Sequence, residues 1–391
     1  MALAREGLEV VALEASTEYE DRVRGESMVP WGVQEARVLG VEQVLRDAGA
    51  HTASFWNQYD ELVSADEAEA NPIPIGILLP GVDSSLNVRH PVACEVLVDA
   101  AAREGAEVHR GVSAVSVTAG ALPALSFTGE DGTRHDLEPR LVVGADGRNS
   151  TVRRQVGIAL ERQDELHMVA GLLLEGVEIP AERDFLAAEG DLFMASFHQH
   201  GGRVRVYLMP GLAQKHRFSG PKGLDEFMAS VGFSCLPFGK ELAAGTPAGP
   251  LASYPGDDSW VAEPFAPGVV LIGDAAGYNN PIIGQGLSIA MRDARTVRDV
   301  VLAGDLAPSS FAPYGAERLE RMRRLRYIAT VLATAMAEDS ADRRGRRMRY
   351  RQLMDEDPLA LPVMIGAFAG PERSPDDAFD GRLVAELQAV G

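Results

Sequence analysis

The chain of 391 residues has a formal net charge of -20, a hydrophobic content of 46% and a mean hydropathy of -0.05. Such a chain can bury a large core, and its length predicts two or three domains. The acidic balance argues against nucleic acid and anionic membrane surfaces as partners, because both attract Lys and Arg. No apolar stretch is long enough for insertion across a bilayer.

The two cysteines, Cys94 and Cys235, lie far apart and outside any CxxC pair. This usage predicts neither a disulfide framework nor a metal site, and it favours buried, inert thiols. The first fifteen residues lack the basic flank and apolar core of a signal peptide, so we expect a cytoplasmic protein.

The first fourteen residues have the pattern of half a nucleotide-binding unit. Residues 3–7 predict the end of a helix with Gly7 as its cap, and residues 8–14 predict a short buried strand that ends in the carboxylate of Glu14. In a βαβ nucleotide-binding unit, an acid at this place binds ribose hydroxyls. We therefore expect a first strand and a GxGxxG turn upstream of Met1, which this sequence does not contain.

Two arginine-bearing segments follow, each before an expected helix. Arg24 lies in a turn that leads into a helix expected over residues 32–48. Arg89 precedes a second helix, with Pro91 suited to a first helical position. Arginines in such turns are either solvated or bind phosphate in a bidentate fork, which Arg does better than Lys.

Short alternating strands are expected next, over residues 107–110, 113–117 and 122–127. A buried strand over residues 140–144 then ends in Ala-Asp-Gly, with Asp146 at its carboxyl end. In an open α/β sheet this is a place where ligand sites form.

The middle of the chain is rich in strands, expected over residues 167–174, 191–197 and 203–209. Along the third of these strands Arg205 and Tyr207 point to one face, because side chains alternate along a strand. This polar face either meets solvent or lines a cavity.

The strongest signal is an apolar strand that ends in Gly273 and Asp274, followed by a Pro- and Gly-rich loop and a long helix expected over residues 285–302. Glycines allow a backbone to approach a planar ring or a diphosphate closely. The helix start offers free N–H groups to negative charge. A plain strand, turn and helix would have little need of these glycines.

Taken in order, these features resemble the para-hydroxybenzoate hydroxylase-like FAD monooxygenases over most of residues 1–302. The resemblance implies an α/β fold in which a GR2-type Rossmann-like FAD-binding domain, here without its first strand and Gly-rich turn, is interleaved with a smaller mixed β-sheet substrate domain. The implied limits are 1–60, 83–165 and 260–310 for the FAD-binding domain, 61–82 and 166–259 for the substrate domain, and 311–391 for a C-terminal helical region.

The resemblance also implies roles for individual residues. Glu14 would meet the adenosine ribose, Arg24 and Arg89 would lie near the FAD phosphates, and Asp146 would serve both FAD and NAD(P)H. Arg205 and Tyr207 are candidates for substrate contact. The implied GD motif at the ribityl chain and isoalloxazine comprises Gly273, Asp274, Pro281, Gly284, Gln285, Gly286 and Leu287. Gly277 stands where many members have His.

The implied activity is that of an NAD(P)H-consuming monooxygenase. NADH or NADPH reduces FAD, O2 adds at flavin C4a, and the hydroperoxide hydroxylates or epoxidises an aromatic or polyketide-like small molecule. Two alternatives stay open: a geranylgeranyl-reductase-like flavin reductase, and a truncated, FAD-free paralogue without enzymatic activity. Flavin halogenases need a lysine in the early half of the chain, but no lysine precedes Lys215.

Overall fold

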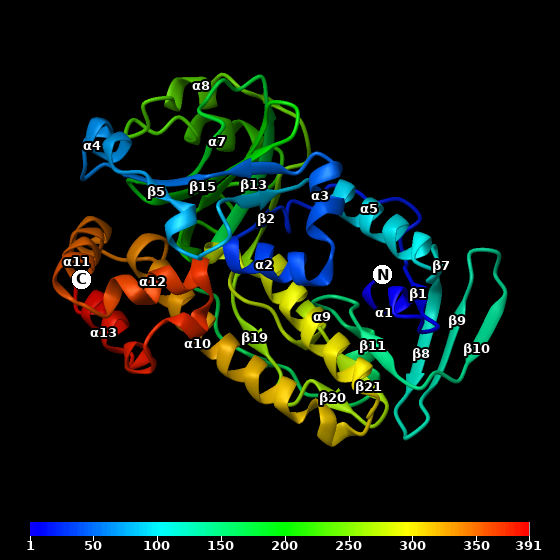
Figure 1. Cartoon of the computed structure of the whole chain (residues 1–391). Helices are drawn as coiled ribbons and strands as arrows, with labels where there is room; N and C mark the ends of the chain where they lie inside the picture. Colours follow the sequence, from blue (N-terminus) through cyan, green and yellow to red (C-terminus); the bar gives the residue numbers. More distant parts are fainter. Residues whose placement is uncertain (391) are drawn as a thin grey trace.

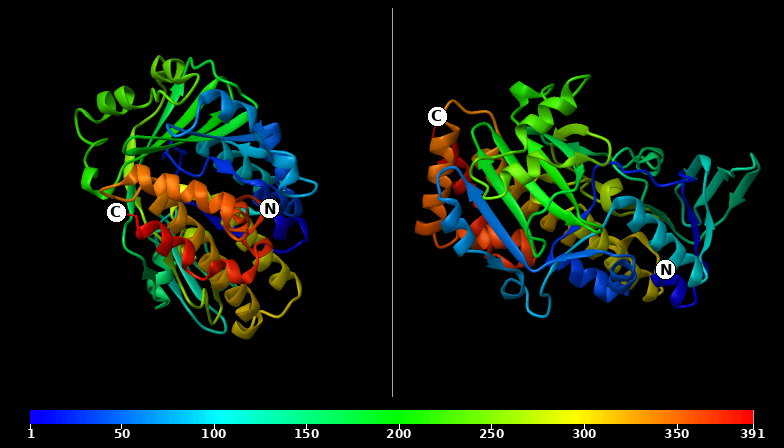
Figure 2. Two further views of the ribbon diagram at one scale, coloured as in Figure 1. Left: turned by 90° about the vertical axis from the view of Figure 1, so that its left-hand side faces the viewer. Right: turned by 90° about the horizontal axis from the view of Figure 1, so that it is seen from above.

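The computed structural model describes residues 1–390 and confirms a mixed α/β chain with several sheets. In Figure 1 a large sheet lies at the top, long helices run along the bottom, and a strand-rich part extends to the right, beside the N-terminus. The C-terminal helices lie on the opposite side of the molecule from the N-terminus, as Figures 1 and 2 both show.

Two small, separate sheets hold the parallel strands that were expected at the cofactor site. Strand β1 (Val11–Leu13) pairs in parallel with β7 (Glu107–His109). Strand β11 (Val142–Gly144) pairs in parallel with β21 (Val269–Leu271), which also pairs with β20 (Phe265–Ala266). Within residues 1–390 no strand is hydrogen-bonded to both sheets. The predicted strands that lead to Glu14 and Gly144 are therefore present, and both are shorter than expected.

Short helices and a hairpin surround these strands. Helix α1 (Ala2–Arg5) ends before Gly7, whose φ of 81° is that of the expected glycine cap. Helix α5 (His90–Arg103) has Pro91 in its first turn, as predicted. The first expected short strand is β7, and the other two lie in the antiparallel sheet that projects to the right in Figure 1. Its strands are β8 (Ser113–Thr118), β9 (Ala124–Thr128) and β10 (Arg134–Leu137).

The large sheet has eight strands. The predicted strands are β13 (His167–Glu175), β15 (Leu192–Gln199) and β16 (Arg203–Met209), and the last has the expected bounds. The remaining strands are β4 (Phe55–Asp60), β5 (Ile73–Pro74), β14 (Arg183–Glu189), β17 (Thr246–Pro247) and β18 (Ala252–Gly256).

One strand of the expected FAD-binding segment 1–60 belongs to the large sheet. Residues 55–60 were assigned to the FAD-binding segment 1–60, but β4 pairs in parallel with β14 inside the large sheet. The chain therefore enters the large sheet before residue 60. The other domain limits stay predictions.

The helix expected over residues 32–48 is two helices, α2 (Pro30–Leu39) and α3 (Glu42–Asp47). Gly40 separates them, because its φ of 71° is left-handed and ends α2. Strand β2 (Ser27–Met28), just before α2, forms a small sheet with β6 (Ser85–Asn87) and β3 (His51–Ala53), in the spatial order β2, β6, β3.

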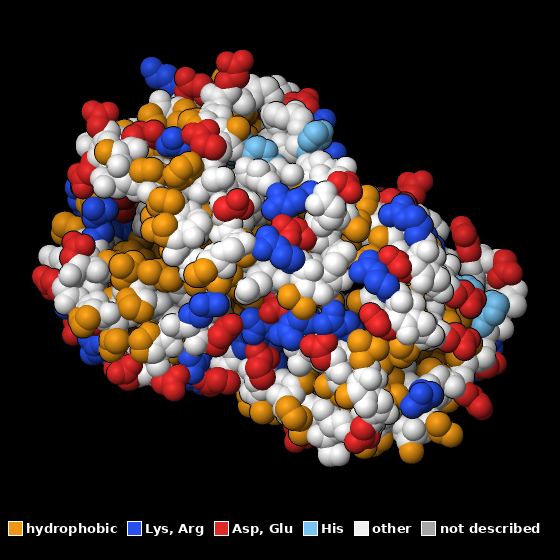
Figure 3. Space-filling view, in the orientation of Figure 1, with side chains coloured by type: hydrophobic (Ala, Val, Ile, Leu, Met, Phe, Trp, Pro, Cys, Tyr) orange, Lys and Arg blue, Asp and Glu red, His pale blue; other side chains and the backbone are white. Residues whose placement is uncertain are grey.

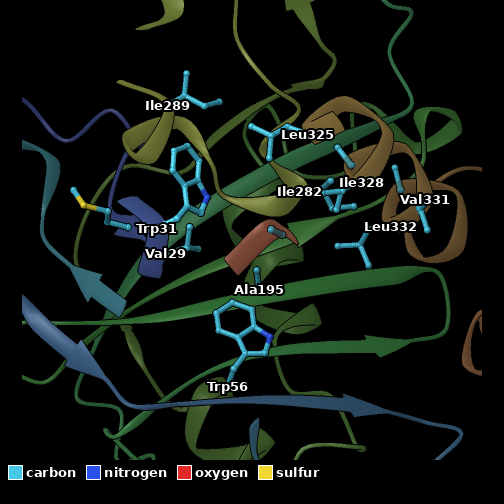
Figure 4. Packing of buried hydrophobic residues seen from close by; sticks show 14 of the residues in the cluster. Val29, Trp31, Trp56, Ala195, Ile282, Ile289, Leu325, Ile328, Val331 and Leu332 are labelled. Carbon is cyan, nitrogen blue, oxygen red and sulfur yellow. The ribbon is translucent and has the colours of Figure 1, made fainter. Parts of the chain in front are cut away.

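The predicted long helix is α9 (Gly286–Leu302), and four helices form the C-terminal region. They are α10 (Ala312–Met336), α11 (Arg343–Glu356), α12 (Ala360–Ala369) and α13 (Arg382–Gln388). A buried core joins them to the large sheet: Figure 4 shows Trp31 of α2, Trp56 of β4 and Leu325 of α10 in one cluster with Ile282. None of the helices in residues 1–390 has the length and apolarity needed to cross a membrane.

Candidate functional site

The arginine-bearing turn is held in a strained conformation. Val23 is fully buried with a φ of 55°, which is rare for a β-branched residue. Asp21 accepts a hydrogen bond from the Val23 N–H at 2.9 Å, and the Tyr254 hydroxyl donates to the Val23 carbonyl at 3.3 Å. With Val23 fixed inward, its neighbours Arg22 and Arg24 are exposed.

Three segments that are distant in sequence meet beside this turn. A methyl group added at Gly25 would lie 3.6 Å from His90 Nδ1 and 3.9 Å from Leu287 Cδ2. Burial lowers the pKa of His90, and the charges of Arg24 and Arg22 lower it further. The structure therefore brings together the arginine turn, the start of α5 and the start of α9.

Glu14 lies at the end of β1, on the same side of the molecule. Its Oε1 accepts a hydrogen bond from the Ser16 N–H at 2.7 Å. Burial raises the pKa of Tyr19 to about 12, and the charge of Glu14 raises it as well, so the two side chains are close. Arg89, in contrast, lines a surface pocket of about 60 Å³ that also includes Gly49, His200 and Arg203.

Asp146 is engaged within its own turn. Its Oδ1 accepts from the Ser150 hydroxyl at 2.5 Å, and its Oδ2 accepts from the N–H groups of Thr151 and Val152 at 2.6 and 3.0 Å. These bonds satisfy the first turn of α6 (Thr151–Gln155). Contact of Asp146 with a cofactor stays a prediction.

Asp274 lies in the segment of residues 273–285, which we call the GD loop. Burial raises the pKa of Asp274, while the nearby charges of Arg148 and Arg24 lower it. Arg148 itself lies 3.6 Å above the ring of Tyr278 and pairs with Asp257 at 3.1 Å. The arginine turn and the GD loop thus share one electrostatic environment.

Glycines shape the GD loop in two ways. A methyl group at Gly277 would lie 2.5 Å from the Ser259 carbonyl oxygen and from the Trp260 Cα, so a side chain does not fit there. At Gly284 and Gly286 the added group would meet nothing within 4 Å. Gly284 and Gly286 therefore leave the backbone open at the start of α9, where a ligand can approach the free N–H groups.

The side chain of Gln285 has a structural role. It is 1% exposed, its Oε1 accepts from Trp31 Nε1 at 2.8 Å, and its Nε2 donates to the Ala367 carbonyl at 3.0 Å. Gln285 therefore ties α2 and α12 to the GD loop, and only its backbone remains for a cofactor. Pro281 begins the short 3-10 turn of this loop, and Leu287 is half-buried on α9.

A buried brace holds the GD loop from α10, and the sequence did not single it out. Arg318 is 1% exposed and donates to the carbonyl oxygens of Gly273, Ala276 and Gly277 at 3.0, 2.7 and 2.9 Å. It also pairs with Asp293 at 2.8 Å, and Asp293 accepts from the Gly273 N–H at 2.9 Å. Helix α10 carries five arginines in its sequence, so no local pattern marks Arg318 as the one that reaches the GD loop.

The two substrate candidates lie in a buried ionic cluster. Arg205 is fully buried and donates to Glu26 from Nε at 2.6 Å and from Nη2 at 2.9 Å, and to Asp21 at 2.5 Å. Tyr207 donates to Glu26 at 3.2 Å. The polar face of β16 is therefore buried, while the Nη1 atom of Arg205 has no partner within the described residues. Substrate contact by these residues stays a prediction.

Basic side chains elsewhere on this side are paired. In Figure 3 they gather where α9 crosses the visible face, with acidic side chains beside them. Arg292 and Arg295 of α9 both bind the carboxylate of Glu35, and Arg298 pairs with Asp299 at 2.6 Å. Arg24, beside the GD loop, is the cation best placed for an anionic ligand.

This arrangement fits FAD. Glu14 and Asp274 would offer carboxylates to hydroxyl groups and Arg24 a guanidinium to phosphate, while Gly284 and Gly286 leave room for a close approach. The orphan Nη1 of Arg205 is a further buried donor near the same turn.

Comparison with known proteins points the same way. Residues 1–214 match the family described as FAD binding domain. Squalene epoxidase of Aspergillus fumigatus is 25% identical over 320 residues, which are 77% of this chain and 63% of that protein. Digeranylgeranylglycerophospholipid reductase of Methanocella arvoryzae is 25% identical over 337 residues, which are 82% of this chain and 79% of that protein.

The chain spans between 47% and 63% of the length of three of its curated relatives. Among solved structures, p-nitrophenol 4-monooxygenase from Pseudomonas putida DLL-E4 is similar with a TM-score of 0.72. The identity is 18%, over 98% of this chain and 93% of that protein, so the likeness concerns the fold.

Proposed function

We propose, from the premise that this chain belongs to the FAD binding domain family, that it is an FAD-dependent monooxygenase. The observation that carries the proposal is the meeting of Gly25, His90 and Leu287 beside Arg24 and Asp274. These residues come from the arginine turn, α5 and the GD loop, and the sequence predicted each of these segments as part of one cofactor site.

Different residues of the site would bind different parts of the cofactor. Glu14 and Asp274 accept hydrogen bonds from sugar and ribityl hydroxyls, and Arg24 neutralises phosphate. The first N–H groups of α9 would stabilise negative charge on the bound ring. FAD, when bound, supplies the activation of O2 with electrons from NADH or NADPH. The protein orients the cofactor and excludes water.

The substrate we propose is an apolar or aromatic small molecule. Figure 4 shows Trp56 and Ala195 of the large sheet on the side of Ile282 in the GD loop. Phe197 belongs to the same buried cluster. The Trp56 ring lies 6.1 Å from Phe197 and 5.1 Å from Phe368, between ring centroids. Arg205, the buried cation of this face, is held by Glu26 and Asp21. These surroundings favour an uncharged substrate over a carboxylate.

A reductase is the second candidate. The match to digeranylgeranylglycerophospholipid reductase covers more of that protein than the match to squalene epoxidase covers of the epoxidase. Such an enzyme would reduce a double bond with the same cofactor and would not transfer oxygen. The third reading, an FAD-free paralogue, needs no flavin at all.

Flavin binding and oxygen consumption separate the three functions. We expect the chain, mixed with FAD and passed through a desalting column, to retain the flavin and to oxidise NADPH or NADH under air faster when a neutral phenol is added. A chain that stays colourless favours the FAD-free reading. Equal turnover in air and under argon favours the reductase.

A further inference from the structure

A buried carboxyl with no cation beside it joins the small sheet to the large sheet. Asp184 of β14 and Asn87 of β6 are both fully buried. Asn87 Nδ2 donates to Asp184 Oδ1 at 2.8 Å and to Oδ2 at 3.0 Å. Within residues 1–390 the only other donor to this carboxyl is the His198 N–H, at 3.4 Å. Burying a carboxylate with amide partners alone is costly, so the position of this group calls for an explanation.

Asn87 lies between two segments of the proposed cofactor site. In the small sheet Asn87 is the partner of Ser27 on β2 and of His51 on β3. Ser27 follows the Gly25–Glu26 turn, and Arg89 and His90 follow Asn87 by two and three residues. A displacement of Asn87 would therefore move both the arginine turn and the start of α5.

Asp184, the partner of Asn87, belongs to the large sheet. Its partner on the neighbouring strand β4 is Trp56. Further along the sheet, Phe197 of β15 is the partner of Arg205 on β16. Trp56 and Phe197 form the aromatic part of the sheet face described above. The pair Asp184–Asn87 thus connects the proposed substrate face to the proposed cofactor segments.

A second side-chain pair connects the large sheet to the segment of β2, and unlike Asp184–Asn87 it includes a cation. Glu26 next to β2 is paired with Arg205 of β16. Around Asp184 the titratable groups are Arg183 on its own strand, His198 on β15 and His51 on β3. Arg183 pairs with Glu69 and Glu182, and the two histidine rings stack with 5.4 Å between centroids. None of these cations binds the Asp184 carboxyl.

We propose that Asp184 is a positioning residue, which holds Asn87 and with it the Ser27 and Arg89 segments in the geometry that binds the cofactor. The proposal rests on the proposed function, because it takes these segments as part of the flavin site. No cation within residues 1–390 binds this carboxyl, so protonation would remove the cost of a buried charge. Burial raises the pKa of Asp184 to about 7, although the Asn87 amide and the His198 N–H act in the opposite direction.

The test uses the full chain with the variants Asn87→Ala, Asp184→Asn and the exchanged pair Asn87→Asp with Asp184→Asn. Gln43→Ala is the control, because Gln43 makes the same amide-to-carboxylate bond to Asp47, at 2.7 Å, on the exposed surface of α3. Hydrogen exchange of the peptides over residues 26–28 and 85–90 is measured without flavin. The dissociation constant for FAD is then measured at pH 6, 7 and 8.

We expect Asn87→Ala to speed exchange in both peptides and to weaken FAD binding about tenfold, the effect of one lost buried hydrogen bond. The exchanged pair should restore both properties, and Gln43→Ala should change neither. The wild type should bind FAD more weakly at pH 8 than at pH 6, and Asp184→Asn should remove that dependence. A purely structural bond would not create this difference in pH profile.

The outcomes that overturn the proposal are distinct. Unchanged exchange over residues 85–90 in Asn87→Ala shows that the pair does not hold β6. Faster exchange with unchanged FAD affinity shows that it holds the sheets without positioning the cofactor segments. If Asn87→Ala does not fold, equal pH profiles of the wild type and Asp184→Asn overturn the proposal. A wild type that binds no FAD refutes the proposed function and, with it, the positioning role, while the exchange data still show whether the pair holds the small sheet.

Discussion

Arg318 and Asp293 form a buried ion pair, 2.8 Å between Nε and Oδ2, that fixes both the backbone N–H and the carbonyl oxygen of Gly273. Although burial raises the pKa of Asp293, Arg318 and Arg321 hold it below its usual value. The charge of Asp293 is therefore kept in the fold, and the loop that carries Asp274 depends on α10.

The first prediction follows from this pair. Arg318→Lys keeps the charge opposite Asp293 but loses most of the donors to the GD loop carbonyls. We expect a loss of FAD affinity of at least about tenfold, since a hydrogen bond to a charged donor contributes about 1.5–3 kcal/mol. Fluorescence titration with FAD measures it. Arg323→Lys, an exposed pair with Glu320 on the same helix, is the control, and equal affinities of the two variants would contradict the brace.

Asp274 gives the second prediction. Asp274→Ala removes the carboxylate beside the open glycines and should weaken FAD by one to two decades, or about 1–3 kcal/mol. The unfolding midpoint should stay close to that of the wild type, because the Asp274 side chain makes no contact in the brace. Asp136→Ala, on the exposed strand β10, serves as control. An unchanged titration would show that Asp274 is a turn residue only.

Arg24 is predicted to recognise phosphate. Arg24→Gln should weaken FAD about three- to tenfold, as expected for an exposed guanidinium that loses one charged contact. Riboflavin lacks the phosphates, so its binding should not change. Equal losses for FAD and riboflavin would place Arg24 away from the phosphates.

The stability of the chain should depend on Asp184 in a defined pH range. Its pKa is raised from 3.8 to about 7 in the folded chain. Below about pH 3.8 the carboxyl is protonated in both states, and its full contribution to stability is present. As the pH rises toward 7, the unfolded chain is ionised while the folded chain keeps the proton, so this contribution is lost progressively.

Urea unfolding of the wild type and of Asp184→Asn between pH 4 and 8 measures this loss. The wild type should lose about 2–4 kcal/mol relative to the variant by pH 7, since each pKa unit corresponds to about 1.4 kcal/mol. Above that pH the two curves should run parallel. Parallel curves over the whole range would mean that the folded and unfolded pKa values are equal.

Local patterns in the sequence predicted much of the fold. The strand Arg203–Met209 and the helix Gly286–Leu302 follow from alternation and from a glycine-rich start. The break between α2 and α3 was missed because Gly40 fits a packing position as well as a left-handed cap. The placement of β4 in the large sheet was missed because its partner, β14, lies more than 120 residues later.

The site was predictable only as separate segments. Glu14, Arg24 and Asp274 each lie at a place that the sequence indicates, but their common environment depends on the tertiary fold. Whether the Arg205 face meets solvent or is buried could not be decided without its partner Glu26, which is 179 residues away. The Arg318 brace could not be predicted either, because its acceptors are backbone carbonyls that no sequence pattern marks.

The origin of the oxygen in the product tests the central claim most directly. The chain is reconstituted with FAD and given NADPH or NADH and a panel of neutral phenols under ¹⁸O2, and the products are examined by mass spectrometry. Monooxygenation predicts one ¹⁸O atom in the product and faster NAD(P)H oxidation with the reacting phenol than without it. Product oxygen that comes from water, or a double bond that the same chain reduces at full rate without O2, would contradict it.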